Sequence, residues 1–193
     1  MSKVAIQGHS SGNGIFTIEA PNGNTNRTLV LPDEAGTVLT SGTPTLLPKG
    51  VPVVRATLSA NQTITGGVWT KVQFNNKTFD TNNFFDITTN YRFQPTIAGY
   101  YQINAGVLYS PGTATAVLSA LYKNGSVYHN MGYAYFNSNY IDDYKAGGNC
   151  VIYLNGSTDY AELYGYLIAS NPHFYGSLAN ASTFFEAVLV RAD

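Results

Sequence analysis

Residues 100–109 read YYQINAGVLY, and this stretch decides the class of fold. Its apolar residues recur at every second position. Because successive side chains of a β-strand point to opposite faces, this spacing indicates a strand with one buried face. The residues expected on the buried face are Tyr101, Ile103, Ala105, Val107 and Tyr109. We therefore predict a long strand that packs one face against a hydrophobic core.

Short alternating runs recur along the rest of the chain, and no window shows the apolar stripe of an amphipathic helix. Further strands are expected at residues 53–58, 69–74, 115–122, 126–130, 149–154, 159–168 and 183–191. Asn124-Gly125 and Asn155-Gly156 lie between expected strands and suit type I′ hairpins, whose central residues have positive φ. This organisation predicts an all-β sandwich or jelly roll.

Residues 1–50 have a different character. They contain three brief strand-like pieces separated by Pro, Asn and Gly, with too little apolar surface for an independent core. Residues 41–52 contain three prolines and suit a stiff connector. We therefore predict an attachment or shaft segment over residues 1–50, which becomes ordered against copies of itself or a partner, and a head over residues 51–193.

Charge is scarce in this chain. Charged residues make up 11% of it, the formal net charge is −1, and the Lys and Arg residues are scattered. Nucleic-acid binding depends largely on clustered cations, so we expect no nucleic-acid partner. No stretch approaches the roughly 20 apolar residues of a membrane helix, and the first residues lack a signal-peptide run. We expect a protein made in the cytoplasm that does not insert into a membrane.

Asp33 and Glu34 form an acidic doublet that follows Pro32. Proline and a following glycine are typical of a tight turn, in which an Asp side chain caps backbone amides. Adjacent residues on an extended chain also point apart, so these two cannot easily flank one bond as an acid and base. We interpret the doublet as turn residues rather than as catalytic carboxylates.

A second doublet, Asp142 and Asp143, precedes a Gly-Gly pair. Carboxylates on a loop can hold Ca²⁺ together with backbone carbonyls, because this ion takes six to eight oxygen ligands. The spacing of the chain identifies no further ligands. We interpret the doublet as solvated loop charge and predict no cofactor, with calcium left open.

The residue types of catalytic sites do not form a recognisable set. Cys150 is the only cysteine, lies in an apolar run and is expected to be a buried small hydrophobe. His9, His129 and His173 share no metal-like spacing, and neither a nucleophile elbow nor a phosphate loop occurs. We therefore expect a protein that is not an enzyme.

Tyrosine is abundant, and residues 128–144 read YHNMGYAYFNSNYIDDY. Tyrosine has a flat apolar face and a polar tip, which suit both subunit interfaces and stacking on sugar rings. Burial or self-association therefore remains an alternative to ligand recognition. The candidate ligand-binding residues, expected on loops, are Tyr133, Tyr135, Asn137, Asn139, Tyr140, Asp142 and Asp143.

Residues 74–101, FNNKTFDTNNFFDITTNYRFQPTIAGYY, resemble the globular head of complement component 1q, which is related to the tumour necrosis factor fold. Residues 120–128 (ALYKNGSVY), 147–166 (GGNCVIYLNGSTDYAELYGY) and 182–193 (STFFEAVLVRAD) extend the likeness to most of residues 53–193. The resemblance implies a ten-stranded jelly roll that forms a homotrimer, with its termini together at one end. The family's calcium sites find no matching residues here.

The last expected strand is apolar on both faces, as a strand must be if the opposite sheet covers one face and a neighbouring subunit the other. The residues expected in the core or the trimer interface are Phe93, Tyr101, Ile103, Val107, Phe184, Phe185 and Val188.

Residues 27–42, RTLVLPDEAGTVLTSG, resemble a short motif of bacteriophage tail fibres and related virion proteins. This likeness implies that the segment belongs to a trimeric connector or attaches to other virion proteins. The residues expected to take part are Leu29, Leu31, Pro32, Asp33 and Gly36.

Together these observations predict a trimeric virion structural protein, on a tail fibre or the capsid surface, whose head binds a host surface glycan or protein. A capsid decoration or head-fibre protein without a receptor role is the alternative. A polysaccharide-cleaving spike enzyme is an alternative of another class, with a catalytic pair drawn from Asp142, Asp143, Asp159 and Glu162. A non-viral cytosolic adaptor fits less well, because so few charges are unusual for a soluble intracellular monomer.

Overall fold

The computed structural model describes residues 11–15, 17, 22–24, 26, 28, 51–109, 113–140, 143–179 and 182–193, and only the backbone of residues 138–140. The chain divides into two units, Met1–Pro44 and Thr45–Asp193. The residues expected in the attachment segment lie outside the described residues. They are Leu29, Leu31, Pro32, Asp33 and Gly36.

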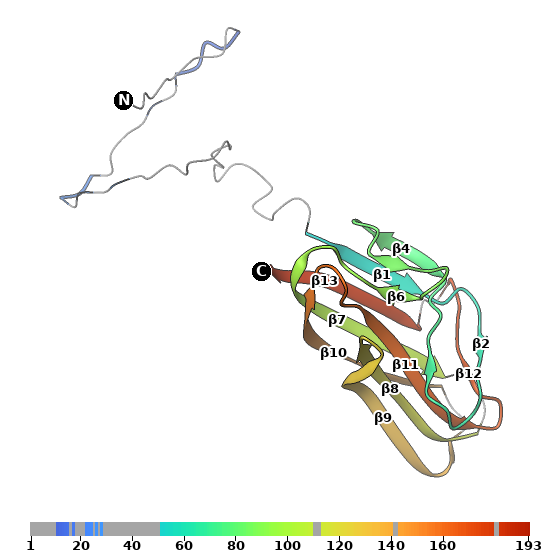
Figure 1. Ribbon diagram of the computed structural model, residues 1–193. Helices are drawn as coiled ribbons and strands as arrows, with labels where there is room; N and C mark the ends of the chain where they lie inside the picture. The colour runs from blue at the N-terminus through green and yellow to red at the C-terminus, as the bar shows by residue number, and fades with distance from the viewer. Residues whose placement is uncertain are drawn as a thin grey trace. The chain divides into compact units, whose positions relative to one another are not determined.

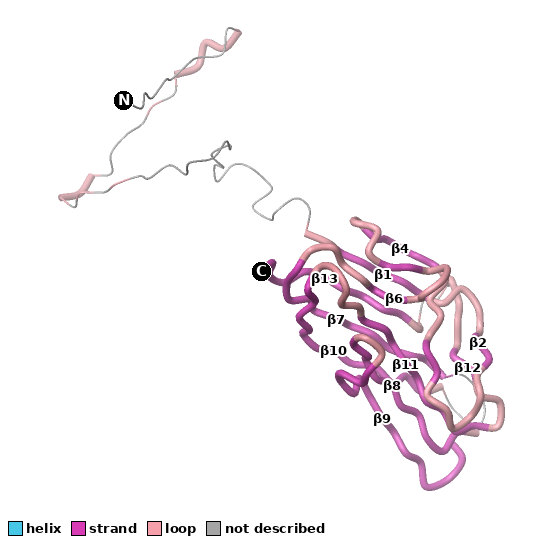
Figure 2. The backbone as a smooth tube through the Cα atoms, viewed as in Figure 1, coloured by secondary structure: helices cyan, strands magenta, loops and turns pink. Residues whose placement is uncertain are grey.

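The described part of the head is built from strands (Figures 1 and 2). The first sheet has the order β10-β7-β13-β1-β4, and its paired strands are antiparallel. Its strands are β1 (Val53–Thr57), β4 (Asn76–Asp80), β7 (Ala98–Tyr109), β10 (Tyr144–Asn155) and β13 (Phe184–Ala192).

The second sheet has the order β5-β6-β11-β8-β9, and β3 also pairs with β11. Its strands are β3 (Thr70–Lys71), β5 (Phe85–Asp86), β6 (Arg92–Phe93), β8 (Ala114–Lys123), β9 (Ser126–Tyr140) and β11 (Ala161–Ala169). A short ribbon pairs β2 (Gln62–Thr63) with β12 (His173–Phe174). The all-β jelly-roll expectation is confirmed. No helix in the described part of the chain is long and apolar enough to cross a membrane.

The core lies between the two sheets, as the alternation in β7 predicts. Tyr101, Ile103 and Val107 are fully buried there, and the ring of Phe93 packs 5.3 Å from that of Tyr101. Phe185 is also fully buried, with its ring 5.2 Å from that of Phe85. Edge-to-face contacts of this kind add to the stabilisation from apolar burial.

The two Asn-Gly turns differ. Asn124 and Gly125 both have positive φ, at 52° and 79°, as the predicted type I′ hairpin between β8 and β9 requires. In the second turn only Gly156 has positive φ, at 68°, so the prediction of a second type I′ turn is wrong. Asn155 instead accepts backbone hydrogen bonds from Ser157, Thr158 and Asp159 through Oδ1, at 2.9–3.0 Å, which forms a longer loop.

The head begins and ends at the same end of the sandwich. Val53 pairs with Val188, and the Leu189 amide donates to the carbonyl of Pro52 at 3.2 Å. The β9–β10 connection lies at the opposite end, because Tyr144 pairs with Tyr109 whereas Asn155 pairs with Ala98. The first strand of the head, β1, therefore begins at the end of the sandwich away from this connection (Figure 1).

Candidate binding surfaces

Five of the predicted ligand-binding residues lie on a strand, and for these the expectation of loops is wrong. They are Tyr133, Tyr135, Asn137, Asn139 and Tyr140. Residues 126–140 form β9, an edge strand of the second sheet. Tyr133 and Tyr135 project from its outer face with 71% and 69% of their surface exposed. Asn137 is also exposed on β9, and Asp143 is exposed beside the start of β10. Asp142 and the side chains of Asn139 and Tyr140 lie outside the described residues.

The residues expected in the core or the interface separate into two groups. Phe93, Tyr101, Ile103, Val107 and Phe185 are buried between the sheets of a single chain. Phe184 and Val188 are half-buried on the opposite face of β13, which is the outer face of the first sheet. Only the second group is therefore placed where a neighbouring copy could contact it.

Phe184 lies in a charged setting on this outer face. The ammonium of Lys145 is 4.5 Å from the centroid of its ring, and the guanidinium of Arg55 is 5.4 Å away. Arg55 also forms an ion pair with Glu186, its partner across β1 and β13. Desolvation by burial lowers the pKa of Lys145, and the positive charge of Arg55 lowers it further. A depression of about 310 Å³ lies beside Phe184, and Gly147 and Gly148 are among the residues that line it.

Near the end of the sandwich where the head begins, the same outer face is aromatic and aliphatic. The rings of Tyr100 and Tyr153 are 5.3 Å apart. Tyr100, Val151 and Val190 expose 43%, 49% and 62% of their surface. Exposed apolar groups that lie together on one sheet are typical of interaction surfaces.

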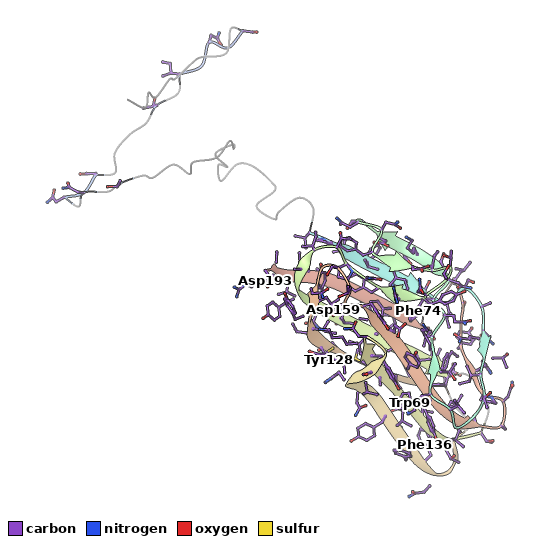
Figure 3. All side chains as sticks on the ribbon, viewed as in Figure 1. Trp69, Phe74, Tyr128, Phe136, Asp159 and Asp193 are labelled. Carbon is purple, nitrogen blue, oxygen red and sulfur yellow. The ribbon has the colours of Figure 1, made fainter. Side chains whose placement is uncertain are left out.

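The outer face of the second sheet carries a larger group of rings. Tyr164 and Tyr166 alternate along β11, and Tyr122 projects from the neighbouring β8. The rings of Tyr122 and Tyr164 stack with centroids 3.9 Å apart. Trp69 lies 5.5 Å from Tyr166 and 6.4 Å from Tyr122, centroid to centroid. Figure 3 labels Trp69 among the side chains of the head. With Tyr133 and Tyr135 these four residues form a surface that we call the aromatic face.

Sequence reasoning missed four members of the aromatic face, Trp69, Tyr122, Tyr164 and Tyr166. A signal for two of them was present. Residues 159–168 alternate so that Tyr164 and Tyr166 fall on one side of the strand and Leu163 and Leu167 on the other. The position of Trp69 depends on the pairing of β3 with β11, which is not readable from sequence.

A polar depression of about 440 Å³ lies beside β5 and β6. Asp86 on its wall accepts hydrogen bonds from the amides of Thr88, Thr89 and Asn90 at 2.9–3.1 Å. These donors, Thr88 first, hold the pKa of Asp86 well below its usual range. A carboxylate that accepts several hydrogen bonds from amides of its own loop stabilises the conformation of that loop.

Asp159 and Glu162, candidates for the catalytic pair of a glycosidase, each contact a lysine. Asp159 accepts from Asn124 at 2.7 Å and pairs with Lys123 at 2.9 Å, and these contacts lower its pKa. Glu162 is buried and pairs with Lys71 at 2.8 Å. A general acid needs a raised pKa, so the lowered pKa of Asp159 favours a structural role for this residue. Among the described residues no group of three His, Cys, Asp or Glu side chains could hold a metal ion.

Cys150 is half-buried on β10, and its burial raises the pKa of the thiol. His173 is buried, and its Nδ1 donates to the carbonyl of Asn171 at 2.9 Å, whereas His129 is exposed on β9. His9 lies outside the described residues. A raised thiol pKa is the opposite of what a cysteine nucleophile needs.

No protein-family model and no curated protein matches the chain. Solved structures do match it. The Eiger TNF of S. frugiperda is 8% identical, with a TM-score of 0.55 over 75% of this chain and 96% of that one. The globular domain of zebrafish complement 1qA is 18% identical, with a TM-score of 0.50 over 74% and 99%. Murine APRIL is 14% identical, with a TM-score of 0.51 over 73% and 100%.

These likenesses establish the fold. The head is a jelly roll of the tumour necrosis factor and complement 1q type, as the resemblance in residues 74–101 implies. At such low identity the likeness extends to the fold alone.

Proposed function

We propose that this chain is a homotrimeric structural protein of a bacteriophage virion, whose head binds a glycan on the host cell surface. Residues 1–50 attach it to other virion proteins. The observation that carries the proposal is the exposure of Tyr133 and Tyr135 on the outer side of β9. The likeness of residues 27–42 to a tail-fibre motif supports the virion context.

The outer face of the first sheet supports self-association. It combines exposed Tyr100, Val151 and Val190 with half-buried Phe184 and Val188. A monomer gains nothing from leaving these groups in water, whereas contact with a second copy would remove them from it. Three copies on one stalk would also present three binding sites, which raises avidity without any new contact.

The arrangement of the head supports recognition at its far end. The chain enters beside Val53, and the β9–β10 connection lies at the opposite end of the sandwich. Side chains near that connection, such as Asn137 and Asp143, would then point away from the particle.

The experiment is immunogold electron microscopy of the purified virus with antibodies against residues 51–193, followed by host-adsorption competition with the full chain. Label at fibre tips and a loss of phage adsorption in the presence of the chain would support the proposal. Label spread over the capsid without competition would favour a decoration protein and overturn the receptor role. Sedimentation of the full chain at micromolar concentration tests the trimer, and a stable monomer would contradict it.

A further inference from the structure

We infer that the aromatic face of the second sheet is a glycan-binding platform, on which a neutral oligosaccharide lies flat across the strands. The inference rests on the proposed function and deepens it by naming the surface and the class of ligand. The residues of this platform are Trp69, Tyr122, Tyr133, Tyr135, Tyr164 and Tyr166.

Strand registers place the rings in rows across the sheet. Tyr166 on β11 pairs with Leu118 on β8, which pairs with Tyr133 on β9. On the other side of Tyr166 lies Trp69, at a ring distance of 5.5 Å. Because neighbouring strands are about 4.8 Å apart, this row of four residues spans roughly 14 Å. Ile168, Ala116 and Tyr135 form the next row along the strands.

Small side chains lie between the larger side chains of this surface. Ala116 and Ala120 have 2% and 0% of their surface exposed, yet neither belongs to the hydrophobic core between the sheets. On the registers they lie between the larger side chains of β9 and β11. The neighbouring side chains therefore cover them on the outside and form a continuous apolar layer.

The rings are held in place before any ligand binds. Tyr122 and Tyr164 stack on one another at 3.9 Å with an interplanar angle of 24°. The loop before Trp69 is fastened to β11, since the amide of Gly67 donates to the carbonyl of Leu167 at 2.8 Å. A surface that is ordered in advance loses little conformational entropy on binding.

The charge of the platform matches an uncharged, hydroxyl-rich partner. The registers place four charged residues on the described part of this face, with two charges of each sign. Lys71 and Glu162 pair at 2.8 Å, whereas Asp86 and Arg92 lie opposite each other across β5 and β6, and Arg92 stacks over the ring of Tyr160 at 4.2 Å. A nucleic acid would need free cations. Flat rings that end in hydroxyl groups instead suit sugar rings, which present an apolar face and polar edges. Burial also raises the pKa of Tyr122 and Tyr164, so their hydroxyls stay protonated and can donate.

Trp69 makes the test direct, because it is the only tryptophan of the chain and lies within the platform. The full chain is titrated with cellohexaose, chitohexaose, maltohexaose and mannohexaose while tryptophan emission is recorded, and is also applied to a printed glycan array. The expected result is saturable binding to at least one neutral glycan, with a shift of Trp69 emission. Absence of binding to every titrated sugar and every array glycan overturns the inference.

Variants then locate the site. Tyr133→Ala combined with Tyr135→Ala should weaken binding at least about tenfold, and the corresponding double Phe variant, which keeps the rings, should retain most of it. Tyr128→Ala is the matched control and should bind normally. Tyr128 is an exposed tyrosine of the same strand, but its hydroxyl donates to the carbonyl of Val151 on β10 and it lies outside the platform. Unchanged glycan binding by the double Ala variant would contradict the inference. So would self-association of the wild-type chain that the double Ala variant abolishes, because these rings would then form a contact between copies.

Host-adsorption competition separates this inference from the proposed function. If the wild-type chain and the double Ala variant compete equally well, the receptor role stands and the platform is wrong. If neither competes although the wild-type chain binds a glycan through these tyrosines, the platform stands and the receptor role fails.

Discussion

The backbone of Gly148 lies against the carbonyl group of Met131, so that β10 and β9 meet although they belong to different sheets. The neighbouring residues Gly132 on β9 and Gly147 on β10 are also in close contact, because a Cβ on Gly132 would lie 2.7 Å from the amide nitrogen of Gly147. No side chain larger than hydrogen fits between these backbones. The two sheets are therefore joined along one side by direct contact of their edge strands.

Gly148→Ala should lower the free energy of unfolding by about 1–3 kcal/mol, because a methyl group there meets backbone that can move only if the strands separate. Urea unfolding of the full chain measures the change. Gly66→Ala is the control, since its Cβ would lie 3.6 Å from Pro172, an ordinary contact. Equal effects of the two variants would show that β9 and β10 are not in close contact.

Asn124→Ala should destabilise the head by about 1–3 kcal/mol. Asn124 has a φ of 52°, donates to Asp159 at 2.7 Å and accepts from the amide of Tyr160 at 3.0 Å. Asn124→Gly loses the same hydrogen bonds but tolerates the positive φ, so it should cost less. Thermal unfolding compares the two variants, and a Gly variant less stable than the Ala variant would contradict this account of the turn.

Ser119→Ala should leave stability unchanged or raise it by up to about 1 kcal/mol. Ser119 is 1% exposed, and its hydroxyl is the one buried side-chain polar atom without a hydrogen-bond partner in the described part of the chain. Thr183→Ala is the matched comparison, because the Thr183 hydroxyl donates to Tyr175 at 2.6 Å and accepts from Leu108 at 3.0 Å. That variant should lose stability. A marked loss on Ser119→Ala instead would reveal an undetected partner.

Asp86 should make the head less stable in acid. Hydrogen bonds from Thr88, Thr89 and Asn90 lower its pKa in the folded state. A group with a lowered folded pKa stabilises the native state above its unfolded pKa, near 4, and this contribution is lost as the pH falls toward the folded value. Unfolding free energies between about pH 6 and pH 2 should therefore decline less steeply for Asp86→Asn than for the wild-type chain. Parallel curves would exclude this role.

The long alternating strand was predictable, whereas the length of β9 was not. In residues 100–109 every second residue from Tyr101 to Tyr109 is buried, and Gly106 is the one further buried residue of this stretch. Residues 126–130 were expected as a short strand, but β9 continues to Tyr140. Register shifts between Ser119 and Ala120 and between Leu121 and Tyr122 interrupt the pairing of β8 with β9. Each irregularity breaks the alternation on which a sequence pattern depends.

The candidate site was predictable only in part for a related reason. Tyr133 and Tyr135 belong to a tyrosine-rich run that is visible in the sequence. Trp69 and Tyr166 are distant in the chain and meet only because β3 pairs with β11. Pairing of distant strands is a property of the whole sandwich, and no local window contains it.

The way the head is joined to the preceding segment also has a mechanical consequence. The chain enters through Val53, and β1 is hydrogen-bonded between β13 and β4. Inter-strand hydrogen bonds of antiparallel sheets lie across the strand direction. A force that pulls the N-terminal segment along β1, while the far end of the sandwich is held, therefore loads all of these bonds in shear at the same time. Detaching β1 would require breaking them at once instead of one after another. A head joined in this way resists tension better than one whose first strand peels from an edge.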